Sequence, residues 1–289
     1  MKLKTLMGDH PVTRQFKTRT DKLDFVECSE AAPLFKRVVR NLEFDVAELA
    51  VVTHILAKAH GKPYRLLPFA VMARYQHPHL VYNAERGVVK PEDLSGKRVG
   101  VRSYSVTTGA WIRCVLAEDH GVDLSSIRWT TFEEPHVAEF RDPPNVQRAP
   151  AGKQIAAMLL AGELDAAILA PPPKDPRLKP VIADPDAAAR DWYRRTRALQ
   201  INHVVVVKQS LTKSDPEAVR ELWRLLVESK RLGGPSEENG VDTRPYGVEA
   251  NRRNLDVAIE TAHRQGLIRR RFAVDELFDE VTRSFTAGV

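Results

Sequence analysis

Strand-like and helix-like segments alternate along nearly the whole chain, and this alternation restricts the fold more than any other feature. Short apolar runs such as residues 201–209, INHVVVVKQ, have the length and β-branched content of buried strands. Segments such as residues 214–233, SDPEAVRELWRLLVESKRLG, carry apolar residues at helical spacing instead. Strands that alternate with helices are typical of proteins in which helices flank a mainly parallel sheet. The sequence therefore predicts an α/β fold.

One predicted helix follows a hydroxyl-rich turn. Thr107 or Thr108 is expected to N-cap a helix that runs to His120. Gly121 is expected to end this helix, because helices commonly stop at a glycine in the left-handed conformation. Residues 133–152 are proline-rich and contain an RDPPN turn, so we expect an irregular loop there.

Bulk composition excludes several classes of protein. The chain has 289 residues, of which 43% are hydrophobic and 28% are charged, as in ordinary globular proteins. No apolar run approaches the length needed to cross a bilayer, so no membrane partner is expected. The start, MKLKTLMGDHP, lacks the apolar stretch of a signal peptide, and we expect a cytoplasmic protein. Cys28 and Cys114 are too far apart for a metal knuckle or a redox motif and are expected to be free thiols.

The net charge of +6 raises the question of nucleic acid, which basic proteins often bind. The basic residues are interspersed with 38 acidic ones and lie in no helix-turn-helix, zinc-finger or RNP-like context. We therefore expect no nucleic-acid partner. The basic balance suits a protein that attracts small anionic ligands, and the arginines at 269–271 are compatible with a homodimer contact.

The turn within residues 97–112, KRVGVRSYSVTTGAWI, is a candidate anion site. Ser103, Thr107 and Thr108 lie between the end of a predicted strand and the start of a predicted helix. Backbone N–H groups and the helix dipole favour a negative charge at such a position. The alternative is that Thr107 or Thr108 only caps the helix, and the residues alone leave both interpretations open.

Six segments in a fixed order carry a resemblance to a known family. They are EFDVAELAVVTH, ARYQHPHLVYN, VGVRSYSVTTGAWIRCVL, IRWTTFEEPHV, INHVVVVKQSL and PYGVEANRRNLDVAIETAHRQGLIRR. Together they resemble the 4,5-dihydroxyphthalate decarboxylase family of the periplasmic-binding-protein type 2 superfamily, over residues 40–280. Two positions depart from the family pattern: Cys114 stands where glycine is favoured, and Asn202 stands where methionine is usual.

The resemblance implies a two-lobed fold in which each lobe is a mainly parallel sheet flanked by helices. Lobe 1 would combine residues 1–81 and 202–289, and lobe 2 would comprise residues 82–201. The chain would cross between the lobes near Tyr82 and Ile201. The ligand would lie in a cleft between the lobes, a common place for binding sites.

The resemblance also implies which residues contact the ligand. The expected substrate-binding residues are Glu48, Thr53, Arg74, Arg102, Ser103, Tyr104, Thr107, Thr108 and Asn202. The expected catalytic residues are His54, His77, Glu134 and His203, with His77 or His203 as the first choice for the proton donor. Arg74 and the 103–108 turn would bind carboxylates, because arginine and N–H donors suit a planar anion.

Non-oxidative decarboxylation of a hydroxylated aromatic acid requires donors for the carboxylates, an acid that protonates the ring and an acceptor for the phenolic hydrogen. Histidine suits the second role because its pKa of about 6.5 lies near working pH. No cofactor is needed for this chemistry, and none is expected. The alternative is a divalent metal held by His77, His79 and Glu134.

The sequence leaves two functions open. The first is a lyase of aromatic-compound catabolism that decarboxylates a phthalate-type acid. The second is a non-catalytic solute-binding protein of the ABC-transporter kind, which captures a small anionic or aromatic ligand and leaves it intact. A ligand-sensing regulator would need a DNA-binding or signalling segment, and the sequence indicates none.

Overall fold

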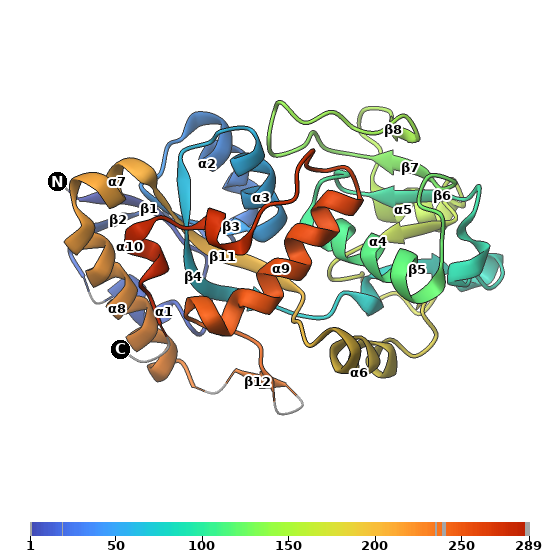
Figure 1. The fold of residues 1–289 in the computed structure, drawn as a ribbon. Helices are drawn as coiled ribbons and strands as arrows, with labels where there is room; N and C mark the ends of the chain where they lie inside the picture. The colour runs from blue at the N-terminus through green and yellow to red at the C-terminus, as the bar shows by residue number, and fades with distance from the viewer. Residues whose placement is uncertain (1, 19, 235, 239–240, 287–289) are drawn as a thin grey trace. The chain divides into compact units, whose positions relative to one another are not determined.

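In the computed structural model, the valine run of residues 204–207 forms the middle of β11 (Ile201–Lys208), an inner strand of a mixed sheet (Figure 1). All four valines are buried, as expected of a strand that is covered on both faces. The structure describes residues 2–18, 20–234, 236–238 and 241–286.

The chain divides into two units. The first contains residues 1–74 and 199–289, and the second contains residues 75–198. The unit boundaries therefore lie at Arg74/Tyr75 and Ala198/Leu199, whereas the sequence placed the crossings near Tyr82 and Ile201. The first boundary lies earlier in the chain because residues 80–83 form a strand that pairs within the sheet of the second unit.

The sheet of the first unit has the strand order β2-β1-β3-β11-β4. Strand β1 runs parallel to β2 and β3, whereas β11 runs antiparallel to β3 and β4. The strands are β1 (Leu3–Leu6), β2 (Leu23–Phe25), β3 (Val46–Ala50), β4 (Tyr64–Ala73) and β11, with β12 (Glu237–Glu238) and β13 (Val241–Asp242) forming a separate ribbon. The helices are α1 (Arg14–Thr18), α2 (Phe35–Asn41), α3 (Val51–Ala59), α7 (Gln209–Ser214), α8 (Pro216–Leu232), α9 (Val248–Arg264) and α10 (Glu280–Arg283), with 3₁₀ turns η1 (Ala32–Leu34) and η5 (Val274–Leu277).

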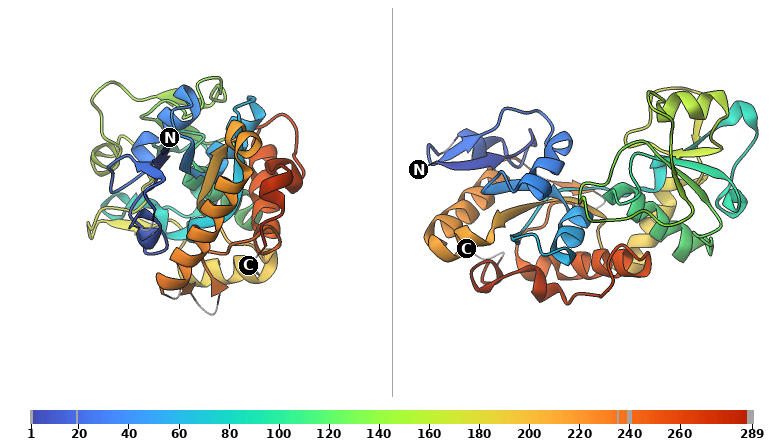
Figure 2. Two further views of the ribbon diagram at one scale, coloured as in Figure 1. Left: turned by 90° about the vertical axis from the view of Figure 1, so that its left-hand side faces the viewer. Right: turned by 90° about the horizontal axis from the view of Figure 1, so that it is seen from above.

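Apolar side chains from the strands and helices of the first unit meet in one core. Val205 and Val207 of β11 pack in the same cluster as Phe69 of β4 and Trp223 of α8. The ring of Trp223 stacks on Phe285 with 4.9 Å between centroids. Helix α9 runs alongside β4 and β11 in this unit (Figures 1 and 2).

The sheet of the second unit has the strand order β10-β5-β9-β6-β7-β8. Strands β9, β6, β7 and β8 run parallel, and β5 and β10 complete the sheet in antiparallel pairings. The strands are β5 (Leu80–Asn83), β6 (Arg98–Val101), β7 (Arg128–Thr131), β8 (Val146–Arg148), β9 (Ala166–Ile168) and β10 (Leu178–Pro180). The helices are α4 (Thr107–His120), α5 (Ile155–Ala161) and α6 (Pro185–Thr196), with 3₁₀ turns η2 (His77–His79), η3 (Ala84–Arg86) and η4 (Pro91–Leu94).

The two α/β sheets confirm the predicted fold class, and several local predictions need correction. The N-cap of α4 is Val106, whose side chain accepts no hydrogen bond, so neither Thr107 nor Thr108 caps the helix. The segment expected to be a loop contains β8, because its backbone extends the parallel sheet beside β7. Among the described residues, no helix is long and apolar enough to span a membrane.

Gly121 ends α4 as the sequence predicted, and its conformation can be tested. Its φ of 62° is left-handed, and its N–H donates to the carbonyl of Leu116. We expect Gly121→Ala to lower the free energy of unfolding by about 1 kcal/mol, because a Cβ is disfavoured in this conformation. Urea denaturation measures the loss. Gly121→Asn should lose less, since asparagine tolerates a left-handed backbone better than alanine, and equal losses in both variants would contradict the interpretation.

Candidate active site

Glu48 is a carboxylate in the middle of an otherwise apolar strand. It lies in β3, where Val46, Ala47, Leu49 and Ala50 are all buried, and Glu48 itself is 1% exposed. Burial of an ionised carboxylate is strongly unfavourable unless hydrogen bonds and positive charge compensate it. The groups around Glu48 therefore define what this part of the first unit can do.

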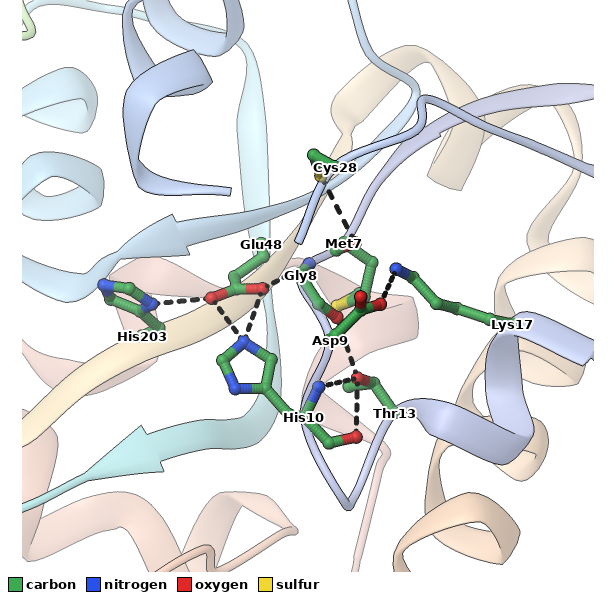
Figure 3. Close-up of polar contacts among 9 residues, drawn as sticks. All are labelled: Met7, Gly8, Asp9, His10, Thr13, Lys17, Cys28, Glu48 and His203. Atoms are coloured by element: carbon green, nitrogen blue, oxygen red, sulfur yellow. Dashed lines mark hydrogen bonds and ion pairs between the residues drawn. The ribbon is translucent and has the colours of Figure 1, made fainter. Parts of the chain in front are cut away.

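His203 of β11 donates to Glu48 from the neighbouring strand. In the antiparallel register Val205 pairs with Glu48 and His203 pairs with Ala50, so Glu48 and His203 are diagonal neighbours on one face of the sheet. The Nδ1 atom of His203 lies 2.6 Å from Oε1 of Glu48 (Figure 3). The rings of Phe35 and His203 pack in a T-shaped arrangement, with 5.1 Å between ring centroids. Strand pairing and aromatic packing thus hold the His203 ring in place.

His10 reaches the same carboxylate from the turn that follows β1. Its Nε2 atom lies 3.0 Å from both oxygens of Glu48, and the N–H of Gly8 donates to Oε2 at 2.8 Å. The turn is held by Thr13, which accepts from the N–H of His10 and donates to the carbonyl of Gly8. A Cβ at Gly8 would lie 3.0 Å from Nε2 of His10 and 3.1 Å from Oε2 of Glu48. Glycine at this position therefore permits the close approach of the three groups.

The electrostatics of Glu48 depend on the two imidazoles. Burial raises the pKa of Glu48, but hydrogen bonds and positive charge from His10 and His203 outweigh burial and hold that pKa well below its ordinary value. Among the described residues, no Lys or Arg forms an ion pair with Glu48. The nearby Lys17 pairs with Asp9 instead. Within the described residues, imidazoles are therefore the ion-pair partners of Glu48.

Cys28 lies close to this cluster and is a neutral thiol. Burial raises its pKa, and the negative charges of Glu48 and Asp9 add to the effect. Its Sγ donates to the carbonyl of Met7 at 3.6 Å (Figure 3). Nucleophilic chemistry needs the thiolate, so these surroundings do not activate Cys28.

The arrangement of Glu48 and His203 is suited to proton transfer. Glu48 accepts the hydrogen of Nδ1, which directs the other ring nitrogen of His203, Nε2, away from the carboxylate (Figure 3). A carboxylate on one side of an imidazole orients the ring and stabilises its protonated form. His203 is 16% exposed and His10 is 20% exposed, so both rings remain accessible from outside the buried cluster.

The structure brings two of the predicted site residues together and adds one that was not predicted. Glu48 and His203 share a hydrogen bond, and His10 joins them. The only sequence signal for His10 is that it follows a predicted strand, and its place in the cluster depends on the parallel pairing of β1 with β3. Asn202, the other candidate in β11, is buried beside His203 in the strand.

The predicted hydroxyl-rich turn joins β6 to α4 in the second unit. Ser103 is 2% exposed, and within the described residues its Oγ has no hydrogen-bond partner. The carbonyl of Ser103 accepts from the N–H of Val106 at 3.2 Å, which closes the turn at the N-terminus of the helix. Thr107 is buried in the first turn of α4, and Thr108 is partly exposed.

The remaining candidates of the second unit have other surroundings. Tyr104 packs in the core, with the guanidinium of Arg113 3.9 Å from its ring centroid. Arg102 forms an ion pair with Glu133 at 3.5 Å, and both side chains are partly exposed. Glu134 is exposed.

Two predicted catalytic histidines are buried. His54 of α3 is 1% exposed, His77 of η2 is 0% exposed, and within the described residues neither ring nitrogen of either has a hydrogen-bond partner. Burial and nearby positive charges lower the pKa of His54 to about 3 and that of His77 to about 4. Both are therefore neutral at pH 7. Thr53 is buried beside His54, and Arg74 is partly buried, with a pKa that burial lowers.

The metal site considered from the sequence, with His77, His79 and Glu134, is not the one that the structure assembles. In the part of the chain that the structure describes, the group of three with metal-ligating atoms in reach of one another is His10, Glu48 and His203. These atoms all lie within 4.8 Å of one another.

Comparison with solved structures defines the class of the fold. The alkanesulfonate-binding protein SsuA from Xanthomonas axonopodis pv. citri superposes with a TM-score of 0.58 at 14% identity, over 96% of this chain and 97% of that chain. The desulfurization enzyme DszB superposes with a TM-score of 0.55 at 15% identity, over 97% of this chain and 98% of that chain. The protein thus has the two-lobed periplasmic-binding-protein type 2 fold, which a binding protein and an enzyme share.

Sequence comparison is more specific than the fold. No family model matches the chain. The 4,5-dihydroxyphthalate decarboxylase of Comamonas testosteroni is 30% identical over 280 residues, which cover 85% of this chain and 85% of the relative. The chain belongs to the 4,5-dihydroxyphthalate decarboxylase family, as its sequence motifs suggested.

The burial of His54 predicts a pH-dependent stability. Its pKa is about 3 in the folded protein and 6.5 ordinarily, so between these values the unfolded chain binds a proton that the folded chain excludes. Stability is therefore full above pH 6.5 and falls as the pH drops below it. Between pH 7 and pH 5, we expect the free energy of unfolding of the parent to fall by about 1 to 2 kcal/mol more than that of His54→Leu. Urea denaturation at the two pH values measures the difference.

The exposed His60 supplies the control for this measurement. His60→Leu should keep the pH dependence of the parent, because the side chain of His60 is exposed to solvent in the folded protein as it is in the unfolded chain. If the free energy of unfolding depended on pH in the same way in the parent and in His54→Leu, the folded protein would bind a proton at His54 as readily as the unfolded chain does.

Proposed function

We propose that this protein catalyses the non-oxidative decarboxylation of a hydroxylated aromatic, phthalate-type carboxylate. Membership of the 4,5-dihydroxyphthalate decarboxylase family supports the reaction class. The observation that carries the proposal is the hydrogen bond of 2.6 Å between Nδ1 of His203 and the buried carboxylate of Glu48. This pair supplies an oriented imidazole, which is what ring protonation requires.

In the proposed reaction, Nε2–H of His203 gives its proton to the ring carbon that bears the carboxylate. The carbon–carboxylate bond then breaks, its electron pair returns to the ring, and carbon dioxide leaves. Glu48 stabilises the imidazolium before the transfer, and His203 regains a proton from solvent afterwards. The net change is the consumption of one proton and the replacement of a carboxylate by hydrogen, so no oxidant, reductant or organic cofactor is required.

The turn at the start of α4 is proposed to bind a substrate carboxylate. Helix N-termini favour anions, and α4 is long enough for its dipole to contribute. Support comes from Ser103, whose buried Oγ has no hydrogen-bond partner within the described residues. A buried hydroxyl without a partner is unfavourable, and a carboxylate oxygen would satisfy it.

The second candidate function is capture of an anionic ligand without turnover. The observation in its favour is the fold, since the neighbour from Xanthomonas axonopodis pv. citri is an alkanesulfonate-binding protein. Incubation with a panel of hydroxylated phthalates and benzoates separates the two functions. Release of carbon dioxide supports the decarboxylase, whereas thermal stabilisation by a panel member without release supports the binding protein.

Replacement of His203 tests its assignment as the proton donor. In His203→Asn the side-chain amide can still donate to Glu48, but it has no group that delivers a proton at the position of Nε2. We expect the turnover number to fall by about 10²- to 10⁴-fold, the usual range for loss of a general acid. Isothermal titration should show substrate affinity close to that of the parent.

His60→Asn serves as the matched control, because His60 is exposed and outside the cluster. It should keep the turnover of the parent. A turnover number for His203→Asn within fivefold of the parent would remove His203 from the proton-transfer step.

Replacement of Ser103 tests the carboxylate-binding turn. We expect Ser103→Ala to weaken substrate affinity by about 10-fold, the loss of one hydrogen bond to a charged group. The turnover number at saturating substrate should change much less, because the hydroxyl binds rather than reacts. Unchanged affinity in a folded Ser103→Ala protein would exclude this turn as the carboxylate site.

A further inference from the structure

The cluster of His10, Glu48 and His203 has an electrostatic property that proton transfer alone does not use. Glu48 is 1% exposed, and within the described residues only imidazoles pair with it. A buried anion is ordinarily matched by a permanent cation such as arginine or lysine. Without a permanent cation beside it among these residues, this buried carboxylate attracts a cation.

The donor atoms have the identity that a transition-metal ion requires, and they lie close to the spacing of its ligands. Nε2 of His10 lies 3.0 Å from both Glu48 oxygens, and Nδ1 of His203 lies 2.6 Å from Oε1. A tetrahedral ion with bonds of about 2.1 Å places its ligand atoms about 3.4 Å apart. One ligand atom from each of the three residues lies within 4.8 Å of the other two, so small side-chain rotations would bring them to the spacing of an ion's ligands.

Neighbouring groups hold Glu48 and His203 in position, and metal ligands in proteins are commonly oriented in this way. The N–H of Gly8 donates to Oε2 of Glu48 at 2.8 Å and orients the carboxylate. Phe35 packs on His203 and limits the rotation of that ring. Two other potential ligands lie nearby, but the thiol of Cys28 is hydrogen-bonded to the carbonyl of Met7 and Asp9 forms an ion pair with Lys17. The three converging donor groups are therefore two imidazoles and one carboxylate.

We propose that His10, Glu48 and His203 form a binding site for one divalent transition-metal ion of the zinc class. Two nitrogen ligands and one oxygen ligand suit Zn²⁺ or Co²⁺, whereas Mg²⁺ prefers oxygen ligands alone. To bind the ion, Nε2 of His10 and Nδ1 of His203 give up the hydrogens that they donate to Glu48. These protons move to the other ring nitrogens or to solvent.

The ion and the catalytic proton involve the same imidazole, at Nδ1 and Nε2 of His203 respectively, which gives the site a regulatory consequence that rests on the proposed function. Coordination of Nδ1 of His203 removes the hydrogen bond by which Glu48 orients the ring for proton delivery. The metal-loaded protein is therefore expected to lose decarboxylation, and a chelator is expected to restore it. Metal binding itself requires no substrate and is measured separately.

Titration of untagged, chelator-treated protein with Co²⁺ and Zn²⁺ tests the site. We expect one Co²⁺ per chain, with visible absorption bands of nitrogen–oxygen coordination that Zn²⁺ displaces, and no competition from Mg²⁺. His10→Gln, Glu48→Gln and His203→Gln should each weaken Co²⁺ binding by about 100-fold. His60→Gln, a change at an exposed histidine outside the cluster, should bind Co²⁺ as the parent does.

Circular dichroism of the metal-free variants shows whether each is folded. Should Glu48→Gln fail to fold, His10→Gln still decides, because His10 lies in a turn and is 20% exposed. Undiminished Co²⁺ binding in folded His10→Gln and His203→Gln would overturn the metal site. Turnover that rises with Zn²⁺ and falls in the cluster variants would retain the site and instead contradict His203 as proton donor.

Discussion

The burial of one carboxylate is the constraint on which the candidate active site depends. Glu48 lies at 1% exposure in β3, so its charge must be met by groups that the fold brings to it. The parallel pairing of β1 with β3 brings Gly8 and His10, and the antiparallel pairing of β3 with β11 brings His203. Each partner thus comes from a strand adjacent to β3 or from the turn that follows one, and the sheet registers set the geometry of the cluster.

The fold could be predicted from the sequence because its signals are local. The valine run of β11, the amphipathic pattern of α8 and the left-handed glycine after α4 each lie within a few residues of the element that they specify. The two errors have different causes. Val106, rather than a threonine, is the N-cap of α4, because the turn that begins at Ser103 makes Thr107 the first residue of the helix. Strand β8 is three residues long and forms by pairing with β7, a long-range interaction that no local pattern indicates.

The site could be predicted only in part because its contacts are distant in sequence. Glu48 and His203 were both candidates, yet they are 155 residues apart, and only the register of β3 with β11 makes them partners. His10 is 38 residues from Glu48, and a histidine in a GDHP turn is indistinguishable from an ordinary surface residue until β1 is paired with β3. His54 shows the opposite case, a residue that the sequence predicted for the site and that the structure buries. Its position in a helix after β3 resembles that of a site residue, but packing buries the whole ring.

In the proposed function, the charge of the cluster favours reaction on an acid over simple capture of one. Within the described residues no arginine or lysine pairs with Glu48, so the carboxylate by itself repels an anionic ligand. Protonation of one imidazole cancels this charge and at the same time places a transferable proton beside a basic partner, since Glu48 orients the protonated ring. Approach of a carboxylate and loading of the proton are therefore favoured by the same electrostatic change. A binding protein would be served better by a permanent cation such as arginine, which holds an anion without giving up a proton.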